Sequence, residues 1–303
     1  MTYRLFDVEV VRRIQLSPSM VRLVFADPDV RHMAIGGPDQ RIKIFFPSAG
    51  QATPQLPRDV NWYAGYRALP PTTRPPMRSY TIRRLDATVA EVEVDFVLHG
   101  DGGPASRWAI RARPGDRTVL SAPDGRDGAI VSGFEWRPPA GTRRLLLVGD
   151  ETAVPAMAAI LEHLADTGCG ATIDVVLEVA GRDDMLSLRA PPQARIDWRA
   201  RDGAAHGRCL LDALAGGAGP PGSAGPVVAR PAHIPSGDAE IDIDRAILWE
   251  TDSAAEAGGG LYVWMAGEAG AVVALRRHLV GVRGIDRRAI ACMGYWRLGR
   301  SLD

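Results

Sequence analysis

The chain has 303 residues, which is long enough for two domains with separate cores. Its residues are 46% hydrophobic and 24% charged, a composition typical of an ordinary soluble protein rather than of a disordered or membrane protein. Its 36 Lys and Arg residues balance 36 Asp and Glu residues, so no overall field favours nucleic acid. Three scattered cysteines exclude a disulfide framework and a protein-ligated iron–sulfur cluster, and the six histidines lack metal-ligand spacing, so a redox centre would have to be an organic cofactor.

The first 120 residues contain short apolar or alternating segments separated by turns. Phe6–Val11, Met20–Ala26 and Arg41–Phe46 have the pattern of strands. Such spacing predicts an antiparallel barrel. The proline-rich stretch 47–76 is predicted to be a long excursion over the barrel, whose aromatic residues either pack on it or contribute to a site.

Two motifs follow this excursion. The first, Arg78-Ser79-Tyr80-Thr81, places a guanidinium and an aromatic ring on one side of a strand, with a hydroxyl next to the ring, which suits a planar phosphorylated ligand. The second runs from His99 to Trp108, and its Gly102-Gly103-Pro104-Ala105-Ser106 core predicts a helix start whose N–H groups bind pyrophosphate. The alternating segment 91–98 is predicted to be one strand with the motifs at its opposite ends. Alone, each motif is also compatible with an ordinary edge strand or a turn.

The second half has a different pattern. After a strand at Val119–Leu120 that is predicted to close the barrel, and a linker at 138–141, apolar strands at Leu145–Val148, Ile173–Val179, Ala194–Trp198 and Leu261–Met265 alternate with helical stripes. This order predicts a parallel α/β sheet of the nucleotide-binding type. We place the domains at 1–138 and 139–303, and we expect the glycine- and proline-rich segment 215–237 to be a mobile surface loop.

Parallel sheets bind ligands beyond the carboxyl ends of their strands, which favours a nicotinamide dinucleotide near Gly149. Thr152 is predicted to cap the following helix with its hydroxyl, and Asp150 and Glu151 are compatible with helix-dipole partners. Arg182, after the second strand, could pair with the 2′-phosphate of NADPH or be a solvated loop residue.

Five blocks occur in the order found in a known family: Arg78–Thr81, His99–Trp108, Gly149–Ala156, Trp264–Glu268 and Gly294–Arg297. Through them nearly the whole chain resembles the siderophore-interacting proteins, which are flavin-dependent ferric-siderophore reductases with a ferredoxin-reductase-like fold. The resemblance implies an FAD-binding barrel domain and an NAD(P)H-binding α/β domain.

By this resemblance, NADPH or NADH reduces FAD held between the domains, and the flavin reduces the ferric iron of a siderophore, which is then released as Fe(II). Tyr80 and Thr81 are the expected catalytic residues at the flavin, Lys43 and Arg297 the expected substrate-binding residues, and no resident metal is expected. Tyr295 or Trp296 is expected to shield the flavin or to pack in the core. The full set of expected cofactor-binding residues is Arg78, Ser79, Tyr80, Thr81, His99, Gly102, Gly103, Ala105, Ser106, Asp150, Thr152, Ala153, Arg182, Gly267, Glu268, Tyr295 and Trp296.

Two alternatives remain open. The chain could be a general flavin reductase that passes electrons to a protein such as a ferredoxin, or a non-catalytic siderophore-binding protein. No apolar run reaches the about 20 residues of a membrane span, and the N-terminal sequence lacks the layout of a secretory signal. We therefore expect a cytoplasmic protein without a membrane span. We also expect it to be a monomer and not to bind nucleic acid.

Overall fold

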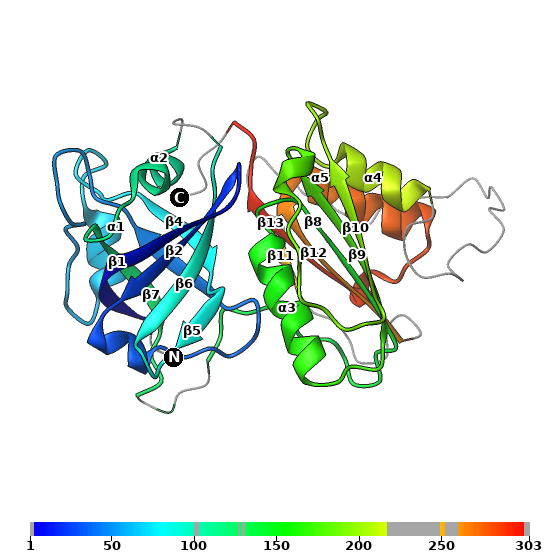
Figure 1. Ribbon diagram of the computed structural model, residues 1–303, viewed down its shortest axis with the longest axis horizontal. Helices are drawn as coiled ribbons and strands as arrows, with labels where there is room; N and C mark the ends of the chain where they lie inside the picture. Colours follow the sequence, from blue (N-terminus) through cyan, green and yellow to red (C-terminus); the bar gives the residue numbers. More distant parts are fainter. Residues whose placement is uncertain are drawn as a thin grey trace. The chain divides into compact units, whose positions relative to one another are not determined.

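The computed structural model describes residues 3–99, 103–126, 128, 131–216, 249–251 and 260–299. The chain divides into two compact units, the first ending at Phe134 and the second beginning at Glu135. Figure 1 labels the helices and strands of both units. Most of the segment 215–237 and the site residue Gly102 lie outside the described residues.

The first unit is a curled antiparallel sheet with the strand order β4-β3-β7-β1-β2-β6-β5. Its strands are β1 (Tyr3–Ser17), β2 (Met20–Ala26), β3 (Arg41–Phe45), β4 (Met77–Thr81), β5 (Arg84–Asp86), β6 (Glu91–Val97) and β7 (Arg117–Pro123). The helical segments are η1 (Pro28–His32), α1 (Trp62–Ala68) and α2 (Pro104–Arg111). The predicted strand at Val119–Leu120 is part of β7, but β7 pairs with both β1 and β3 and so lies within the sheet, where it does not close the barrel as predicted.

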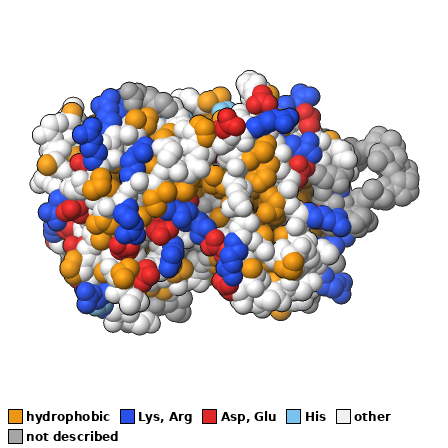
Figure 2. Space-filling model, in the orientation of Figure 1, with side chains coloured by type: hydrophobic (Ala, Val, Ile, Leu, Met, Phe, Trp, Pro, Cys, Tyr) orange, Lys and Arg blue, Asp and Glu red, His pale blue; other side chains and the backbone are white. Residues whose placement is uncertain are grey.

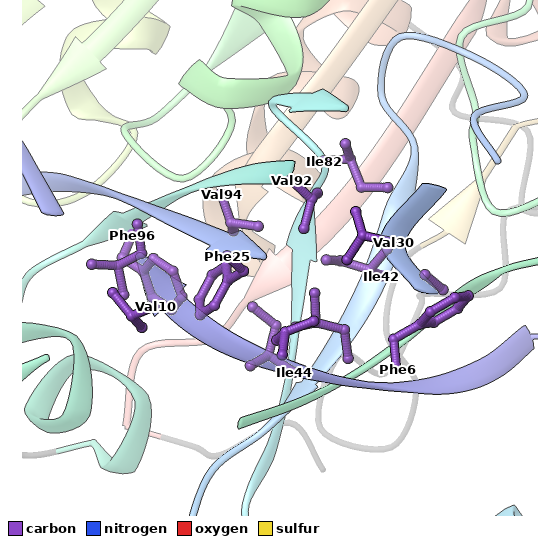
Figure 3. Close-up of a cluster of buried hydrophobic side chains, with 14 of the residues drawn as sticks. Phe6, Val10, Phe25, Val30, Ile42, Ile44, Ile82, Val92, Val94 and Phe96 are labelled. Atoms are coloured by element: carbon purple, nitrogen blue, oxygen red, sulfur yellow. The ribbon is translucent and has the colours of Figure 1, made fainter. Parts of the chain in front are cut away.

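Between β4 and β5, the consecutive residues Ile82 and Arg83 bond to different parts of the sheet. The Ile82 N–H donates to the Gln40 carbonyl at 2.8 Å, whereas the Arg83 N–H donates to the Glu93 carbonyl at 2.9 Å. The chain therefore changes partner strands within one residue, and this step links the two edge strands of the sheet. The inside is filled by side chains that converge from several strands, among them Phe6, Phe25, Ile42, Ile44 and Phe96 (Figure 3).

The long excursion 47–76 contains a helix that the sequence patterns did not predict. In α1, Tyr66 is buried and packs edge-on against Phe45 with ring centroids 5.1 Å apart, and Met77 and Val119 complete this cluster. The aromatic residues of the excursion therefore cover the outer face of β3, β4 and β7, which favours the packing alternative for them.

The second unit is a six-stranded sheet with the order β10-β9-β8-β12-β13-β11, in which only β11 runs antiparallel to its neighbour. Its strands are β8 (Arg144–Gly149), β9 (Thr172–Val179), β10 (Ala194–Ala200), β11 (Trp249–Glu250), β12 (Leu261–Glu268) and β13 (Ile290–Trp296). Its helical segments are α3 (Val154–Asp166), η2 (Arg182–Asp184), α4 (Arg208–Ala215), α5 (Ala269–Arg277), the π-helical turn η4 (His278–Val282) and η5 (Arg287–Ala289).

Helices cover both faces of this sheet (Figure 1). One face packs on α4 and α5 through residues such as Leu146, Val148, Leu214 and Val272, whereas α3 lies over the other face. The strands β8, β9, β10, β12 and β13 are parallel, so the predicted parallel α/β sheet is confirmed. Because β8 has β9 on one side and β12 on the other, the strand order reverses between β8 and β12.

Candidate functional site

The strand β4 carries the arginine and tyrosine of the first motif on the inner face of the barrel sheet. Tyr80 pairs with Ile42 and Arg78 with Ile44, so both side chains share the face of these core residues, as predicted. The Tyr80 ring lies 4.4 Å, centroid to centroid, from that of Phe96. Burial raises the pKa of the Tyr80 phenol, against the Arg78 charge, so the hydroxyl stays neutral at physiological pH.

The two motifs do not lie at opposite ends of one strand, because β5 and a reversal of the chain separate β4 from β6. The sequence-based prediction was wrong on this point: it treated the segment between the motifs as a single strand. The reversal brings the end of β6 back towards β4, as the contact between Tyr80 and Phe96 shows. The structure therefore brings the two motifs closer together than the prediction did.

The second motif forms a tight turn into α2. The His99 N–H donates to the Ser106 hydroxyl at 3.1 Å, and Ser106 and Ala105 are buried. Gly103 precedes the helix in an extended conformation, Pro104 occupies the first helical turn, and no described side chain caps the helix. A side chain at Gly103 would bring its Cβ within 3.3 Å of the His99 ring. The first N–H groups of α2 are therefore available to an anion.

Lys43 and Ser79 lie on the opposite face of the same sheet. They are cross-strand partners, and the Lys43 Nζ donates to the Ser79 Oγ at 2.5 Å. Strand alternation places the Thr81 side chain on this face as well, next to Arg41, while its backbone continues directly from Tyr80. Burial lowers the pKa of Lys43, and the charge of Arg41 lowers it further.

In the second unit, the predicted nicotinamide residues meet where the strand order reverses. Gly149 at the end of β8 pairs with Ala266 of β12, so Asp150 and the Gly267-Glu268 turn are neighbours although they are distant in sequence. A Cβ on Gly149 would lie 2.5 Å from the Ala153 Cβ, and a Cβ on Gly267 would lie 2.7 Å from Asp150 Oδ2. Both glycines thus permit close approach of the chain, and ligands of parallel sheets bind at this kind of position.

The Asp150 carboxylate is buried at the centre of this turn and accepts four hydrogen bonds. Its Oδ1 accepts from the N–H (2.9 Å) and hydroxyl (2.5 Å) of Thr152, and its Oδ2 accepts from the Glu268 N–H and the Trp296 indole, each at 2.8 Å. Burial raises the pKa of Asp150, the nearby Glu151 charge adds to this, and the hydrogen bonds oppose it. The carboxylate therefore ties the ends of β8, β12 and β13 together.

The predicted cap of α3 is wrong. Thr152 donates its hydroxyl to Asp150, α3 begins two residues later at Val154, and its N-cap is Ala153 with no capping side chain among the described residues. The Thr152 hydroxyl, which was expected to accept a hydrogen bond at the start of the helix, is instead directed to the Asp150 carboxylate two residues earlier. Pro155 does stand in the first turn, as predicted. The turn after β12 differs, since there the Glu268 side chain caps α5 by accepting the Ala271 N–H at 2.8 Å.

A buried ion network beside Asp150 was missed by sequence reasoning. Arg201, which follows β10, donates to both Glu151 oxygens at 2.6 and 2.7 Å and to Glu178 at 3.3 Å. Burial lowers the pKa of Arg201, but the bonds and charge of Glu151 outweigh it, so the net shift is upward. Glu178 also accepts the Gly207 and Cys209 N–H groups. Glu151 is therefore a partner of a strand-end arginine, and nothing local in the sequence signals this pairing.

Arg182 begins η2 directly after β9, at the edge of the sheet. With Trp198, Asp197 and Arg199 of β10 it lines a hollow of about 470 Å³. Arg199 is held by Asp197 at 2.8 and 2.6 Å, whereas Trp198 is half-buried. The sequence patterns singled out Arg182 but not Trp198, because an aromatic residue in a strand is usually a packing residue.

The two aromatic residues at the end of β13 have separate surroundings. Tyr295 stacks on Trp249 with centroids 6.1 Å apart and meets Trp264 edge-on, whereas Trp296 bonds to Asp150 and contacts the His206 ring at 4.7 Å. In the β12–β13 pairing, Gly267 lies opposite Gly294 and Glu268 lies opposite Trp296, so the register shifts by one residue at Tyr295. Such a bulge re-aims side chains next to a site.

Comparison with known protein families identifies the family of this chain. Residues 9–127 match the siderophore-interacting FAD-binding domain, and residues 142–299 match the model named siderophore-interacting protein. The chain belongs to the siderophore-interacting protein family. Its two units have the ferredoxin-reductase-like fold, and the first unit is an FAD-binding domain.

Relatives of this siderophore-interacting protein cover nearly its whole length. An uncharacterised protein of Mycobacterium tuberculosis is 33% identical, with 97% of this chain and 90% of the relative covered. The ferric vibriobactin reductase ViuB of Vibrio cholerae is 29% identical with the same coverage. The crystal structure of a siderophore utilization protein from T. fusca matches with a TM-score of 0.72 and 30% identity, covering 100% of this chain and 97% of that one.

The described part of this siderophore-interacting protein offers no site for a resident metal ion, since no group of three or more His, Cys, Asp or Glu residues is arranged to hold one. Nor does any helix there have the length and hydropathy of a membrane-spanning segment. An FAD fits the first unit, because an uncapped helix start, an arginine and an aromatic ring are the groups that a phosphate and a flat ring require.

Proposed function

We propose that this protein is a reductase that uses NADPH or NADH and bound FAD to reduce the ferric iron of a siderophore, so that iron is released as Fe(II). The observation that carries the proposal is the pairing of Arg78 and Tyr80 on one face of β4 with the uncapped start of α2, within the residues that match an FAD-binding domain. The reductase name of the Vibrio relative supports the reaction.

In the first unit, the groups divide into those that hold phosphate and those that hold the flavin ring. Arg78 and the N–H groups that follow Gly103, at Ala105 and Ser106, bind the pyrophosphate, and His99 borders this region, whereas Ser79 lies on the opposite face of β4. Tyr80 packs on the flavin, and Thr81 offers its backbone groups to the ring edge, since its side chain lies on the other face of β4. When bound, the flavin accepts two electrons as a hydride and releases them one at a time.

In the second unit, the dinucleotide binds where the strand order reverses. Asp150, Thr152 and Ala153 form one side of the turn, and Gly267 and Glu268 form the other. Because its four bonds occupy the Asp150 carboxylate, that residue acts by fixing the turn. Arg182 is suited to a 2′-phosphate, and this favours NADPH over NADH. The expected contact of Tyr295 or Trp296 with the flavin depends on the family resemblance and stays a prediction.

The ferric siderophore is the substrate. Basic and acidic side chains are interspersed over the visible face of the barrel unit (Figure 2), so no broad positive surface is available there to attract an anionic chelate. Binding therefore needs a local cation. We assign this role to Lys43, with Arg297 as a second cation. Reduction weakens the affinity of iron for hard oxygen ligands, so the protein needs no separate release step. A cytoplasmic location and a monomeric state complete the proposal.

The test combines the absorbance spectrum of the purified protein with a ferrous-iron trap assay. A yellow protein that forms Fe(II) from ferric siderophore with NADPH, without any ferredoxin, supports the proposal. Arg78→Ala is expected to lose FAD, whereas Arg84→Ala, an exposed arginine paired with Asp86, is the control that keeps it. A protein that needs a ferredoxin would be a general reductase, and a colourless protein that binds ferric siderophore but refuses FAD would be a binding protein.

A further inference from the structure

The turn after β8, to which the proposed function assigns the dinucleotide, contains two buried acidic side chains. Asp150 and Glu151 follow Gly149 directly, and a negative charge at this place would repel a bound pyrophosphate. The Asp150 carboxylate is stabilised by four hydrogen bonds from groups at the ends of β8, β12 and β13. Glu151 instead depends on a partner from another edge of the sheet.

That partner is Arg201, which directly follows β10 and is separated from β8 by β9. Its Nη1 and Nη2 donate to Oε2 and Oε1 of Glu151 at 2.6 and 2.7 Å, which is the bidentate geometry of a strong arginine–carboxylate pair. Only 8% of each side chain is exposed, so salt and water screen this pair poorly. The positive charge of Arg201 therefore acts on Glu151 at nearly full strength.

The loop after β10 fixes the position of this arginine. The fully buried Glu178 accepts a hydrogen bond from the Gly207 N–H at 2.8 Å and one from Arg201 Nη1 at 3.3 Å. The His206 ring contacts the Trp296 ring of β13, with centroids 4.7 Å apart. The loop is thus anchored at both ends, which holds the Arg201 guanidinium in place.

The unbalanced charge of Glu151 would act on a phosphate at short range, because Glu151 lies between Asp150 and Thr152, two residues of the proposed dinucleotide site. At about 8 Å and an effective dielectric constant of about 20, two like unit charges lower a binding constant by more than tenfold. A turn with two acidic residues can accept an anion only if this repulsion is cancelled.

We propose that Arg201 is a positioning residue for the hydride donor, which cancels the charge of Glu151 and so allows the turn to bind the pyrophosphate of a dinucleotide. The inference rests on the proposed function, because it concerns the same site. Arg201 acts through Glu151. Its loss should therefore weaken the binding of donors that carry a pyrophosphate and spare the reaction of a donor without one.

The test measures KM and kcat of the FAD-loaded full-length protein with excess ferricyanide and three hydride donors. These are NADPH, NADH and N-benzyl-1,4-dihydronicotinamide, which has the same reactive ring but no phosphate. Arg201→Gln is expected to raise KM for NADPH and for NADH by about tenfold, to change kcat by less than about twofold, and to leave the phosphate-free donor unaffected. Adding Glu151→Gln to this variant should restore both KM values. Arg276→Gln is the matched control, since this half-buried arginine pairs with Glu250 in the same unit.

Arg201→Gln leaves buried carboxylates without their cation, so its folding is checked by circular dichroism. Glu151→Gln alone keeps the test valid if that variant unfolds, because it removes the anion and should leave KM for NADPH unchanged or lower it. A raised KM in Glu151→Gln, an equal loss with the phosphate-free donor, or an effect on NADPH but not on NADH would overturn the inference. If neither NADPH nor NADH reduces the flavin of the wild type, the proposed function itself fails.

Discussion

Gly149, at the end of β8, offers the sharpest test of how the turn at Asp150 is packed. An added Cβ would lie 2.5 Å from the Ala153 Cβ, 2.9 Å from the Ala266 carbonyl oxygen and 3.1 Å from the Met157 sulfur. The first two of these atoms belong to a helix start and a central strand, so neither can move cheaply. Overpacking of this kind costs about 3 kcal/mol, the upper end of the usual range.

Gly149→Ala is therefore expected to lower the midpoint of thermal unfolding by roughly 6–12 °C, the shift that such a cost produces in a domain of this size. Circular dichroism and urea unfolding measure it. Gly170→Ala is the matched control in the same unit, since no described atom lies within 4 Å of its Cβ position. This control should be unchanged or slightly more stable, by less than about 1 kcal/mol.

A second substitution separates the packing argument from a general effect of glycine replacement. In the Gly149→Ala background, Ala153→Gly removes the 2.5 Å contact, so we expect the double variant to recover about half of the lost stability. The packing argument would be refuted if Gly149→Ala unfolded at the wild-type midpoint, or if the effects of the two substitutions simply added.

Three further predictions concern charged and titrating groups. In a urea titration, Arg201→Ala should destabilise the second unit by about 3 kcal/mol or more, because it leaves the buried Glu151 and Glu178 without their cation. The control Arg199→Ala breaks an exposed ion pair and should cost less than about 1 kcal/mol in the same titration. Lys43 is the only lysine in the sequence, so ¹³C-lysine NMR should show a single titration, with a midpoint below 10.5. Because the pKa is lowered in the folded protein, the free energy of unfolding should rise with pH between that midpoint and 10.5. A midpoint at or above 10.5 would contradict the burial argument. Burial, with help from Glu250, raises the pKa of the Cys292 thiol to about 12. Because Cys169 and Cys209 are also free thiols and are only partly buried, the test uses a variant in which both are replaced by serine. In that variant an aromatic disulfide reagent at about pH 8 should label Cys292 only after unfolding, and rapid labelling of the native variant would refute its burial.

Local patterns predicted the elements well where a strand or helix has one clear buried face. The alternation in 91–98 became β6, with Val92, Val94 and Phe96 fully buried, and the apolar run at Leu145–Val148 became the central β8. The glycines and proline before Ser106 correctly marked the start of α2. In these cases the residue types and their spacing were sufficient.

The sequence was insufficient where an outcome depends on a partner that is distant in the chain. Thr152 has the right residue type for a helix cap, but it precedes the N-cap residue Ala153 and its hydroxyl bonds to Asp150, whose other oxygen is held by Glu268 and Trp296. Strand β5 was missed because it has only three residues and its pairing with β6 defines it. The Arg201 network likewise depends on strand order, which no local pattern contains.

The position of β12 between β8 and β13 sets the order in which this unit can be completed during synthesis. The ribosome delivers β8, β9 and β10 long before β12, so the nascent domain holds a sheet whose β8 edge is open. The turn at Asp150 has only one of its two sides until β12 pairs with β8, because Gly267 and Glu268 belong to β12. The bonds from the Glu268 N–H and the Trp296 indole to Asp150 can therefore stabilise only the finished sheet.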